Sequence, residues 1–209
     1  MGPPASGKGT QAELIKAHYG IQPASTGAML RDELARGTEL GLEADRITRE
    51  GNLVPDALIL EIVEDWLKDH HDAFVVDGFP RTVPQAIGFD RLLEQYDAAV
   101  DCVLFFDIPE QTIRDRVLNR VSCEACGHIY RLGMQVASLE EECPACKGRL
   151  VRRNDDSLTA LSRRMDVYRE LTLPVVDYYR KKGIVADLTA ADRPETVFAE
   201  ISSILEEIE

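Results

Sequence analysis

The sequence lacks any apolar stretch near the ~20 residues that a membrane-spanning helix requires. It also lacks the basic and then apolar opening that marks a secretory leader. Internal repeats and low-complexity linkers are absent too. We therefore expect a cytoplasmic protein that has no membrane partner. The 209 residues suit one α/β domain with insertions, or two small domains.

Positive charge is scarce in this chain. Lys and Arg number 24 against 37 Asp and Glu, which gives a net charge of −13. A field of that sign repels nucleic acid and anionic membranes, so no nucleic-acid partner is expected. A nucleotide substrate is still compatible with this charge, provided that basic groups gather at one place.

The start of the chain has a phosphate-binding pattern. Residues 2–10 read Gly-Pro-Pro-Ala-Ser-Gly-Lys-Gly-Thr, and a helical segment follows at residues 11–19. Loop amides, the positive end of a helix and Lys8 together suit a polyphosphate. Gly9 stands where Ser or Thr usually follows the Lys, and Ala5 stands where Gly would fit more easily. The alternative is a glycine-rich turn that only precedes a helix.

Such a loop normally follows a buried central strand, but only Met1 precedes Gly2 here. We therefore expect the first β-strand to be missing from the chain as written. A start assigned too late, a lost N-terminus or another segment in that position would each explain this. Loss of a central strand would cost more than the roughly 5–15 kcal/mol by which a typical domain is stable.

The rest of the chain alternates strands and helices. Strands are expected at 73–77, 100–106 and 184–188, and helices at 56–68, 82–95, 110–120 and 157–182, the last divided or kinked at Pro174. Residues 23–51 read as short helices at 28–36 and 42–50. The pattern predicts an α/β fold with a mainly parallel sheet between helices. The loop, Asp77 and Asp107 would then meet at the carboxyl ends of the strands.

Four of the five cysteines form two Cys-x-x-Cys pairs, Cys123 with Cys126 and Cys143 with Cys146. This spacing favours a closed, structural Zn²⁺ site of four thiolates. Two disulfides or free buried thiols are the alternatives, and disulfides are rare without a secretory leader. Cys102 lies in an apolar run and is expected to be a buried strand residue.

Several arginines flank loops and the cysteine segment. Arg81 closes a sharp turn after a strand, Arg116 and Arg120 are expected on one helical face, and Arg153 and Arg164 follow the cysteines. Any one of them alone reads as a solvated surface group. Together they could close over phosphates with bidentate geometry.

These motifs resemble adenylate kinase of the long bacterial type with a zinc-bearing lid. The resemblance rests on residues 2–11, on Ser-Thr-Gly-Ala-Met-Leu-Arg at 25–31, on Asp-Gly-Phe-Pro-Arg-Thr at 77–82 with Gln85, and on the cysteine segment with its exit. It extends from Gly2 to the C-terminal helix. It implies a P-loop kinase fold with a core of residues 1–22, 52–120 and 153–209. Residues 23–51 would be the AMP-binding insertion and residues 121–152 the zinc-binding lid.

The resemblance also implies a role for each site residue. ATP would bind Ala5, Ser6, Gly7, Lys8, Gly9, Thr10, Arg116, Arg120, Ile129 and Tyr130, with Arg193 near the adenine. AMP would bind Thr26, Arg31, Asn52, Leu53, Val54, Gly78, Phe79, Pro80, Arg81, Gln85, Arg153 and Arg164. The catalytic set would be Lys8, Arg81, Arg120, Arg153 and Arg164. Asp77 would hold water on Mg²⁺, and the Phe79–Pro80 peptide bond would be cis.

The implied reaction is ATP + AMP giving two ADP, reversibly, by a monomer whose partners are ATP, AMP and ADP. The AMP phosphate, with a second pKa of ~6, is already an ionised nucleophile, so no general base is required. Another nucleoside monophosphate kinase, acting on UMP or CMP or using GTP, is an alternative. So is a truncated, inactive zinc protein that binds nucleotide. The chain departs from the family at position 28, where Ala replaces the usual Asp.

Overall fold

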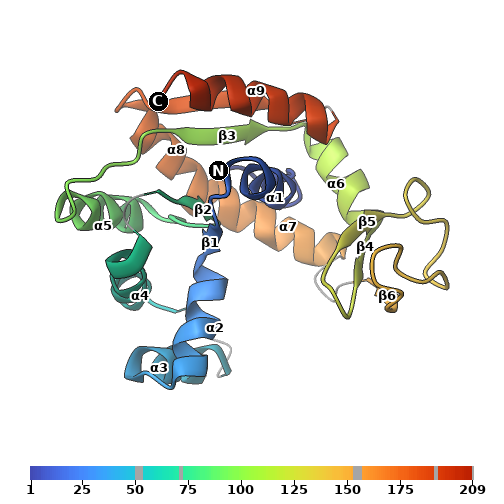
Figure 1. Ribbon diagram of the computed structural model, residues 1–209, viewed down its shortest axis with the longest axis horizontal. Helices are drawn as coiled ribbons and strands as arrows, with labels where there is room; N and C mark the ends of the chain where they lie inside the picture. The colour runs from blue at the N-terminus through green and yellow to red at the C-terminus, as the bar shows by residue number, and fades with distance from the viewer. Residues whose placement is uncertain (50–53, 71–72, 153–156, 191–192, 209) are drawn as a thin grey trace.

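The computed structural model describes residues 1–49, 54–70, 73–152, 157–190 and 193–208. Two arms extend from a central body (Figure 1). The helical arm consists of α2 (Thr26–Arg36) and α3 (Glu39–Arg49). The cysteine arm, residues 120–151, contains β4 (Arg120–Cys123), β5 (Ile129–Arg131) and β6 (Leu150–Val151) in one antiparallel sheet.

The body contains two parallel strand pairs. β1 (Pro23–Ser25) pairs with β2 (Val75–Asp77), and β3 (Val103–Asp107) pairs with β7 (Val185–Thr189). The three predicted strands are thus confirmed as β2, β3 and β7; β2 and β3 are shorter than expected, and β7 has the expected length but lies one residue later. The prediction of helices alone in residues 23–51 was wrong at its start, because residues 23–25 form β1. A strand of three residues shows no alternation that sequence analysis could detect.

Met1 lies along β3. The Phe106 N–H donates to the Met1 carbonyl at 2.9 Å, and the Met1 amine donates to the Leu104 carbonyl. Among the described residues no strand precedes the phosphate loop, and this pairing supplies part of the contact that a strand there would make. That a first strand is missing from the chain stays a prediction.

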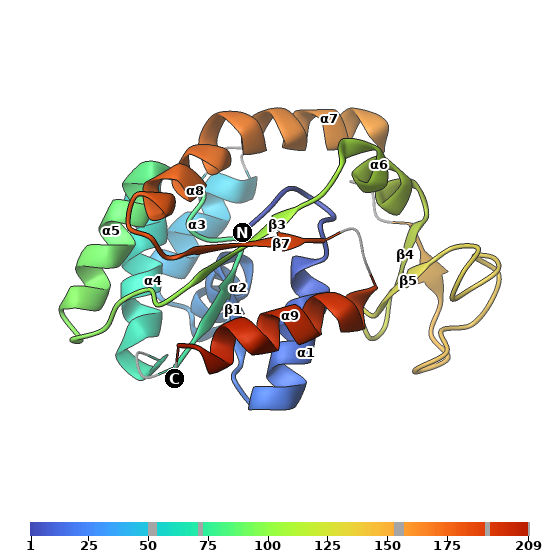
Figure 2. The ribbon, with the colours of Figure 1, turned by 90° about the horizontal axis from the view of Figure 1, so that it is seen from above.

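Helices cover both faces of β3 and β7. Figure 2 shows α7 (Leu158–Val167) and α8 (Leu173–Arg180) on one side, with α1 (Lys8–Tyr19) and α9 (Pro194–Glu206) on the other. Ile15, Phe106, Leu188 and Ile201 are buried together between α1, the strands and α9. The expected helices on both faces of parallel strands are therefore confirmed for β3 and β7, which form a sheet separate from that of β1 and β2. None of the described helices combines the length and apolar character needed to cross a membrane.

Three further helices belong to the body. They are α4 (Asp56–His70), α5 (Val83–Glu94) and α6 (Glu110–Leu118). The predicted division of the helix at 157–182 is confirmed: a π-helical segment, Tyr168–Thr172, separates α7 from α8, and Pro174 is the second residue of α8. Such segments often occur at functional sites. Here the Thr172 hydroxyl donates to the Arg81 carbonyl at 3.2 Å.

Candidate nucleotide site and metal centre

The phosphate loop passes closely over β3 and then enters α1. Gly2 has φ 148°, and a Cβ built there would lie 2.9 Å from the Cβ of Phe106, so the position requires glycine. Gly7, at the helix N-cap, has a left-handed conformation with φ 102°. Ala5 also has a positive φ, of 59°. This agrees with the sequence expectation that Gly would fit more easily at that position.

Lys8 lies inside its own loop. Its Nζ donates to the carbonyls of Gly2 at 2.9 Å and Pro3 at 2.8 Å, and to the hydroxyl of Ser6 at 3.2 Å. These weak acceptors are groups that a phosphate oxygen could replace, because an anion binds a buried ammonium more strongly than a neutral carbonyl does. The loop therefore holds the cation where the sequence pattern predicts a polyphosphate site.

The charges around Lys8 show which other groups converge there. Burial lowers the pKa of Lys8 to about 8, Asp77 opposes that shift, and Arg164 and Arg81 add to it. Asp77 ends β2, and its Oδ2 would lie 3.9 Å from a Cβ built at Gly9. Asp77 therefore lies beside the loop, as predicted. The positive charges of the predicted site residues Arg81 and Arg164 also act on the Lys8 ammonium.

Asp107 ends β3 at the same edge of the body. Its charge acts on Tyr168, whose pKa is raised to about 12 by burial first and by Asp107 second. The Asp107 carbonyl accepts a hydrogen bond of 2.9 Å from the Ala190 N–H. Asp107 thus interacts with the π-helical segment Tyr168–Thr172 and with β7 and the residue that follows it.

Arg116 braces the phosphate loop. Its Nη1 donates to the Ser6 carbonyl at 3.0 Å, and its Nη2 donates to the Ala190 carbonyl at 2.7 Å. Burial, and then Arg131, lower the pKa of this guanidinium. The expectation that Arg116 and Arg120 share a helical face was wrong, because α6 ends at Leu118 and Arg120 begins β4. Since the paired strand segment competes with the last helical turn, a pattern of spacing alone cannot place this boundary.

The turn after β2 is tightly organised. The Phe79–Pro80 peptide bond is cis, as predicted. Nε of Arg81 donates to the Gly78 carbonyl at 2.6 Å, and the Arg81 side chain is exposed. The Arg81 N–H donates to Oε1 of Gln85 at 2.8 Å. The turn thus fixes both an exposed guanidinium and a buried amide.

The structure places the other predicted AMP residues around α2. Thr26 is buried at the start of α2, and Arg31 is exposed on the same helix. Val54 packs against the apolar cluster shared by α2, α4 and α5. The remaining predicted ligands Asn52, Leu53 and Arg153 lie outside the described residues.

Asp56 contacts the predicted AMP ligand Gln85, and the sequence analysis did not single it out. Its carboxylate accepts hydrogen bonds from Gln85 Nε2 at 2.6 Å and from the Thr82 hydroxyl at 2.7 Å. In the sequence, Asp56 follows Pro55 and reads only as a good first residue of a helix. The contact joins residues that are 29 positions apart, and no local pattern signals it.

Besides Arg120 in β4, the predicted ATP contacts Ile129 and Tyr130 also lie in the cysteine arm, and Arg193 lies at α9. Ile129 is 46% exposed, whereas the Tyr130 side chain is buried in the arm and its hydroxyl lies 3.2 Å from the Cys143 Sγ. Arg193 is exposed at the N-cap of α9. If Tyr130 meets ATP, it does so through its main chain.

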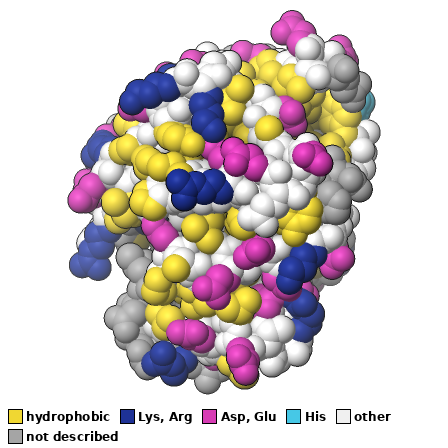
Figure 3. Space-filling model, turned by 90° about the vertical axis from the view of Figure 1, so that its left-hand side faces the viewer, with side chains coloured by type: hydrophobic (Ala, Val, Ile, Leu, Met, Phe, Trp, Pro, Cys, Tyr) yellow, Lys and Arg dark blue, Asp and Glu magenta, His cyan; other side chains and the backbone are white. Residues whose placement is uncertain are grey.

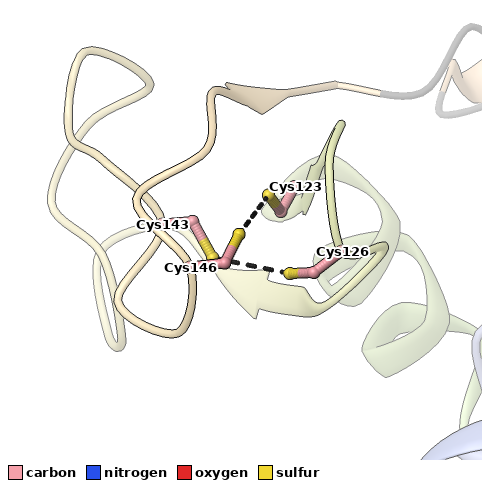
Figure 4. Close-up of side chains that lie close together, drawn as sticks. All are labelled: Cys123, Cys126, Cys143 and Cys146. Carbon is pink, nitrogen blue, oxygen red and sulfur yellow. Dashed lines mark hydrogen bonds between the residues drawn. The ribbon is translucent and has the colours of Figure 1, made fainter.

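The four paired cysteines converge on one point (Figure 4). Their Sγ atoms all lie within 4.8 Å of one another, with 3.4 Å between Cys123 and Cys146 and 3.7 Å between Cys126 and Cys143. Four thiolates at Zn–S distances of about 2.3 Å would lie ~3.8 Å apart, so this donor set fits a tetrahedral metal. The expectation for Cys102 was wrong: it precedes β3 and is partly exposed.

The protonation of the cluster also suits a cation. Burial alone would raise the pKa of Cys143, but hydrogen bonds from Tyr130 and from main-chain N–H groups lower it to about 6. The Gly148 N–H lowers the pKa of Cys146, but that pKa is raised to about 12 overall, because the Cys146 thiol donates its proton to the sulfurs of Cys126 and Cys123. Neighbouring thiolates repel one another, and a divalent cation removes that repulsion.

The surface away from the site is of mixed charge. On the face that Figure 3 shows, Lys and Arg side chains are dispersed among Asp and Glu, with apolar side chains between them. No continuous basic patch forms on this face. The concentration of positive charge around Lys8 therefore contrasts with an acidic chain as a whole.

Comparison with known proteins agrees with this geometry. The family model described as adenylate kinase matches residues 1–184. The protein named adenylate kinase of Archaeoglobus fulgidus is 40% identical over 210 residues, which cover 100% of this chain and 97% of the relative. Those of Carboxydothermus hydrogenoformans and Syntrophomonas wolfei are 40% and 38% identical, over 99% and 100% of this chain and 97% and 98% of the relatives. The chain belongs to the adenylate kinase family.

Proposed function

We propose that this chain catalyses the reversible transfer of a phosphoryl group from ATP to AMP, which yields two ADP. The main support is the position of Lys8 in a phosphate loop, where Asp77, Arg81 and Arg164 act on its charge. A site that binds two anions needs cations from several elements, and the three cations come from the start of α1, the turn after β2 and α7, with the Asp77 carboxylate at the end of β2. Membership of the adenylate kinase family gives the same reaction.

The ATP half of the site consists of the loop and its neighbours. The amides of residues 5–10 and the Lys8 ammonium would bind the β- and γ-phosphates, with the N-terminus of α1 behind them. Arg116 would keep the loop in place through its bonds to Ser6 and Ala190. Arg120, Arg193 and the main chain at Ile129 and Tyr130 would contact the rest of the nucleotide.

The AMP half lies between the helical arm and the turn after β2. Thr26, Arg31, the segment 52–54, Gly78, Phe79 and Pro80 would enclose the nucleoside, and Gln85 would contact its base. Arg81, Arg153 and Arg164 would bind the phosphates. Guanidinium groups suit this task because they bind phosphate in a bidentate manner and stay charged.

The chemistry then depends on position rather than on a general base. The AMP phosphate is largely ionised at neutral pH, since its second pKa is ~6. The protein has to align it with the γ-phosphate, neutralise both anions and exclude water. Asp77 would hold water on Mg²⁺, which neutralises the developing charge on the phosphate oxygens when it is bound with ATP.

The two arms would provide the closure. Residues 23–51 would move over AMP and residues 121–152 over ATP, on a core of residues 1–22, 52–120 and 153–209. A structural Zn²⁺ held by the four cysteines would let the cysteine arm move as one body. We further propose that the protein acts as a cytoplasmic monomer.

The test is a panel of nucleotides. Purified protein with Mg²⁺ and ATP is offered AMP, GMP, CMP and UMP, and the diphosphates are separated by chromatography. We expect ADP to form fastest, from AMP. A preference for UMP or CMP would show that the chain is a different monophosphate kinase. Binding of nucleotide with no transfer would contradict the proposed function.

A further inference from the structure

The closest contacts of the proposed base-binding residue Gln85 are with Asp56 and with the main chain of Arg81. Asp56 Oδ1 accepts from Gln85 Nε2 at 2.6 Å, and Gln85 Oε1 accepts from the Arg81 N–H at 2.8 Å. Asp56 begins α4, whereas Gln85 lies in the first turn of α5. One carboxylate thus joins the two helices at the amide that is proposed to face the base.

We propose that Asp56 is a positioning residue that determines base specificity, because it fixes the orientation of the Gln85 amide so that adenine is preferred to guanine. The inference rests on the proposed function, in which Gln85 contacts the base of AMP. It concerns a different residue and a different property, namely which of two purines is accepted.

The chemistry of the two partners allows only one orientation of the amide. A carboxylate can only accept hydrogen bonds, so the NH₂ end of Gln85 must face Asp56. A main-chain N–H can only donate, so the oxygen of Gln85 must face Arg81. Gln85 is 6% exposed, and a flipped amide would therefore leave both partners unsatisfied in a buried place.

The rest of the contact network holds the carboxylate itself. Asp56 Oδ2 accepts from the Thr82 hydroxyl at 2.7 Å, and that hydroxyl in turn accepts from the Gln85 N–H at 3.2 Å as the N-cap of α5. Both carboxylate oxygens are therefore engaged with the same turn of α5. Rotation of Asp56 would break a bond at each oxygen.

An amide of fixed orientation can tell the two purines apart. After the bonds to Asp56 and Arg81 are made, Gln85 retains one N–H donor and one oxygen lone pair. Adenine presents a donor at its 6-amino group and an acceptor at N1, whereas guanine presents an acceptor at O6 and a donor at N1. The same amide turned over would suit guanine. The fixed orientation of the Gln85 amide therefore favours adenine over guanine.

Substitution of Asp56 by Asn tests this directly. The change keeps the size of the side chain but supplies an NH₂ group that can donate to the Gln85 oxygen. One of the two partners then tolerates the flipped amide, and only the Arg81 N–H still opposes it. We expect the ratio of kcat/KM for AMP to that for GMP to fall about tenfold or more, the scale of one hydrogen bond to a charged group. The KM for ATP should stay unchanged. Should Asp56→Asn fail to fold, Asp56→Ala removes the acceptor and should lower the ratio too.

Asp65→Asn is the matched control. It removes one negative charge from the same helix, where Asp65 pairs with Arg36 at 3.0 Å and Lys68 at 2.8 Å, and it should leave the AMP to GMP ratio unchanged. A second control places Asp56→Asn in a Gln85→Ala background. If Asp56 acts through Gln85, the substitution adds no further change in the ratio there.

The outcomes separate this inference from the proposed function. A wild-type ratio in both Asp56 variants, or an equal loss of ratio with and without Gln85, would overturn the role of Asp56 while transfer from ATP to AMP persists. An unchanged ratio in Gln85→Ala would overturn it as well. Failure of the unmodified protein to form ADP would overturn the proposed function first.

Discussion

The helical arm and the cysteine arm extend from the same body but are stabilised in different ways. The helical arm shares a large apolar cluster with α4 and α5, in which Met29 and Ala44 of the arm pack with Ile62 and Phe89. The cysteine arm has a separate, smaller cluster that includes two of its own cysteines. The first arm is therefore an extension of the core, whereas the second has a small core of its own, and we infer that it depends on a metal ion held by its four cysteines.

The two arms also differ in their buried ionisable groups. In the helical arm, Glu33 is 3% exposed, and Arg36 and Thr38 satisfy its carboxylate within the arm. In the cysteine arm the concentrated groups are thiols, which need a cation when they ionise. We conclude that removal of metal should affect one arm and leave the other intact, and the predictions below test this difference.

The largest effect is expected from Cys143→Ser. Structural zinc contributes on the order of 10 kcal/mol to the folding of small metal domains, and loss of one thiolate should release the metal and unfold the cysteine arm. Hydrogen exchange followed by mass spectrometry should show lost protection in residues 120–151 and native protection in α2 and α3. Cys102→Ser, outside the cluster, is the matched control. Absence of metal from the intact protein would refute this account.

A smaller effect is expected when the two helices of the helical arm are forced apart. A Cβ built at Gly41 lies 2.4 Å from the main-chain carbon of Glu33, which cannot move without a shift of α2. Gly41→Ala should cost about 1–3 kcal/mol of stability and raise the KM for AMP but not for ATP. In Gly37→Ala, where nothing lies within 4 Å, only the positive φ contributes. Equal effects from both variants would argue against close packing of α2 on α3.

In the central body, the protonation of Lys8 should make nucleotide binding depend on pH. Without nucleotide, the pKa of Lys8 is lowered to about 8 by burial. Phosphates bind the protonated form, so ATP affinity should be constant below pH 8 and fall by up to about tenfold per pH unit above it. Calorimetric titration with a non-hydrolysable ATP analogue from pH 7 to 9.5 measures this. A flat profile, or the same fall in Lys8→Met, would contradict the prediction.

The smallest effect concerns the start of α2. The Ser25 hydroxyl caps this helix by accepting from the Ala28 N–H at 3.2 Å. Ala28→Asp would add a carboxylate that can return a bond to the Ser25 N–H and favour the helix N-terminus, worth about 0.5–1 kcal/mol. Thermal unfolding should show a modest rise in Tm that salt reduces. Ala28→Asn separates charge from shape, and a lower Tm in Ala28→Asp would contradict the reasoning.

Local chemistry made much of this structure predictable from the sequence. The phosphate loop, the β2, β3 and β7 strands, the break before Pro174 and the convergence of the cysteines all depend on short-range patterns, and the structure contains each of them. The family resemblance supplied the reaction and the AMP residues, which no pattern of spacing would have given.

What the sequence did not reveal depends on long-range contacts or on competition at element ends. β1 has three residues and exists only because β2 pairs with it. Arg120 lies outside α6 because β4 begins at this residue. The proposed role of Asp56 depends on its contact with Gln85 of α5. The Tyr130 side chain is buried because its hydroxyl forms a hydrogen bond with the Cys143 sulfur.

The most direct test of the central claim compares wild-type protein and Lys8→Met in the formation of ADP from ATP and AMP with Mg²⁺. The account predicts that the wild-type protein forms ADP and that the variant, folded by circular dichroism, turns over at least about a thousandfold more slowly. Near-normal turnover in Lys8→Met would contradict the proposal that the loop at the N-terminus of α1 holds the transferred phosphate.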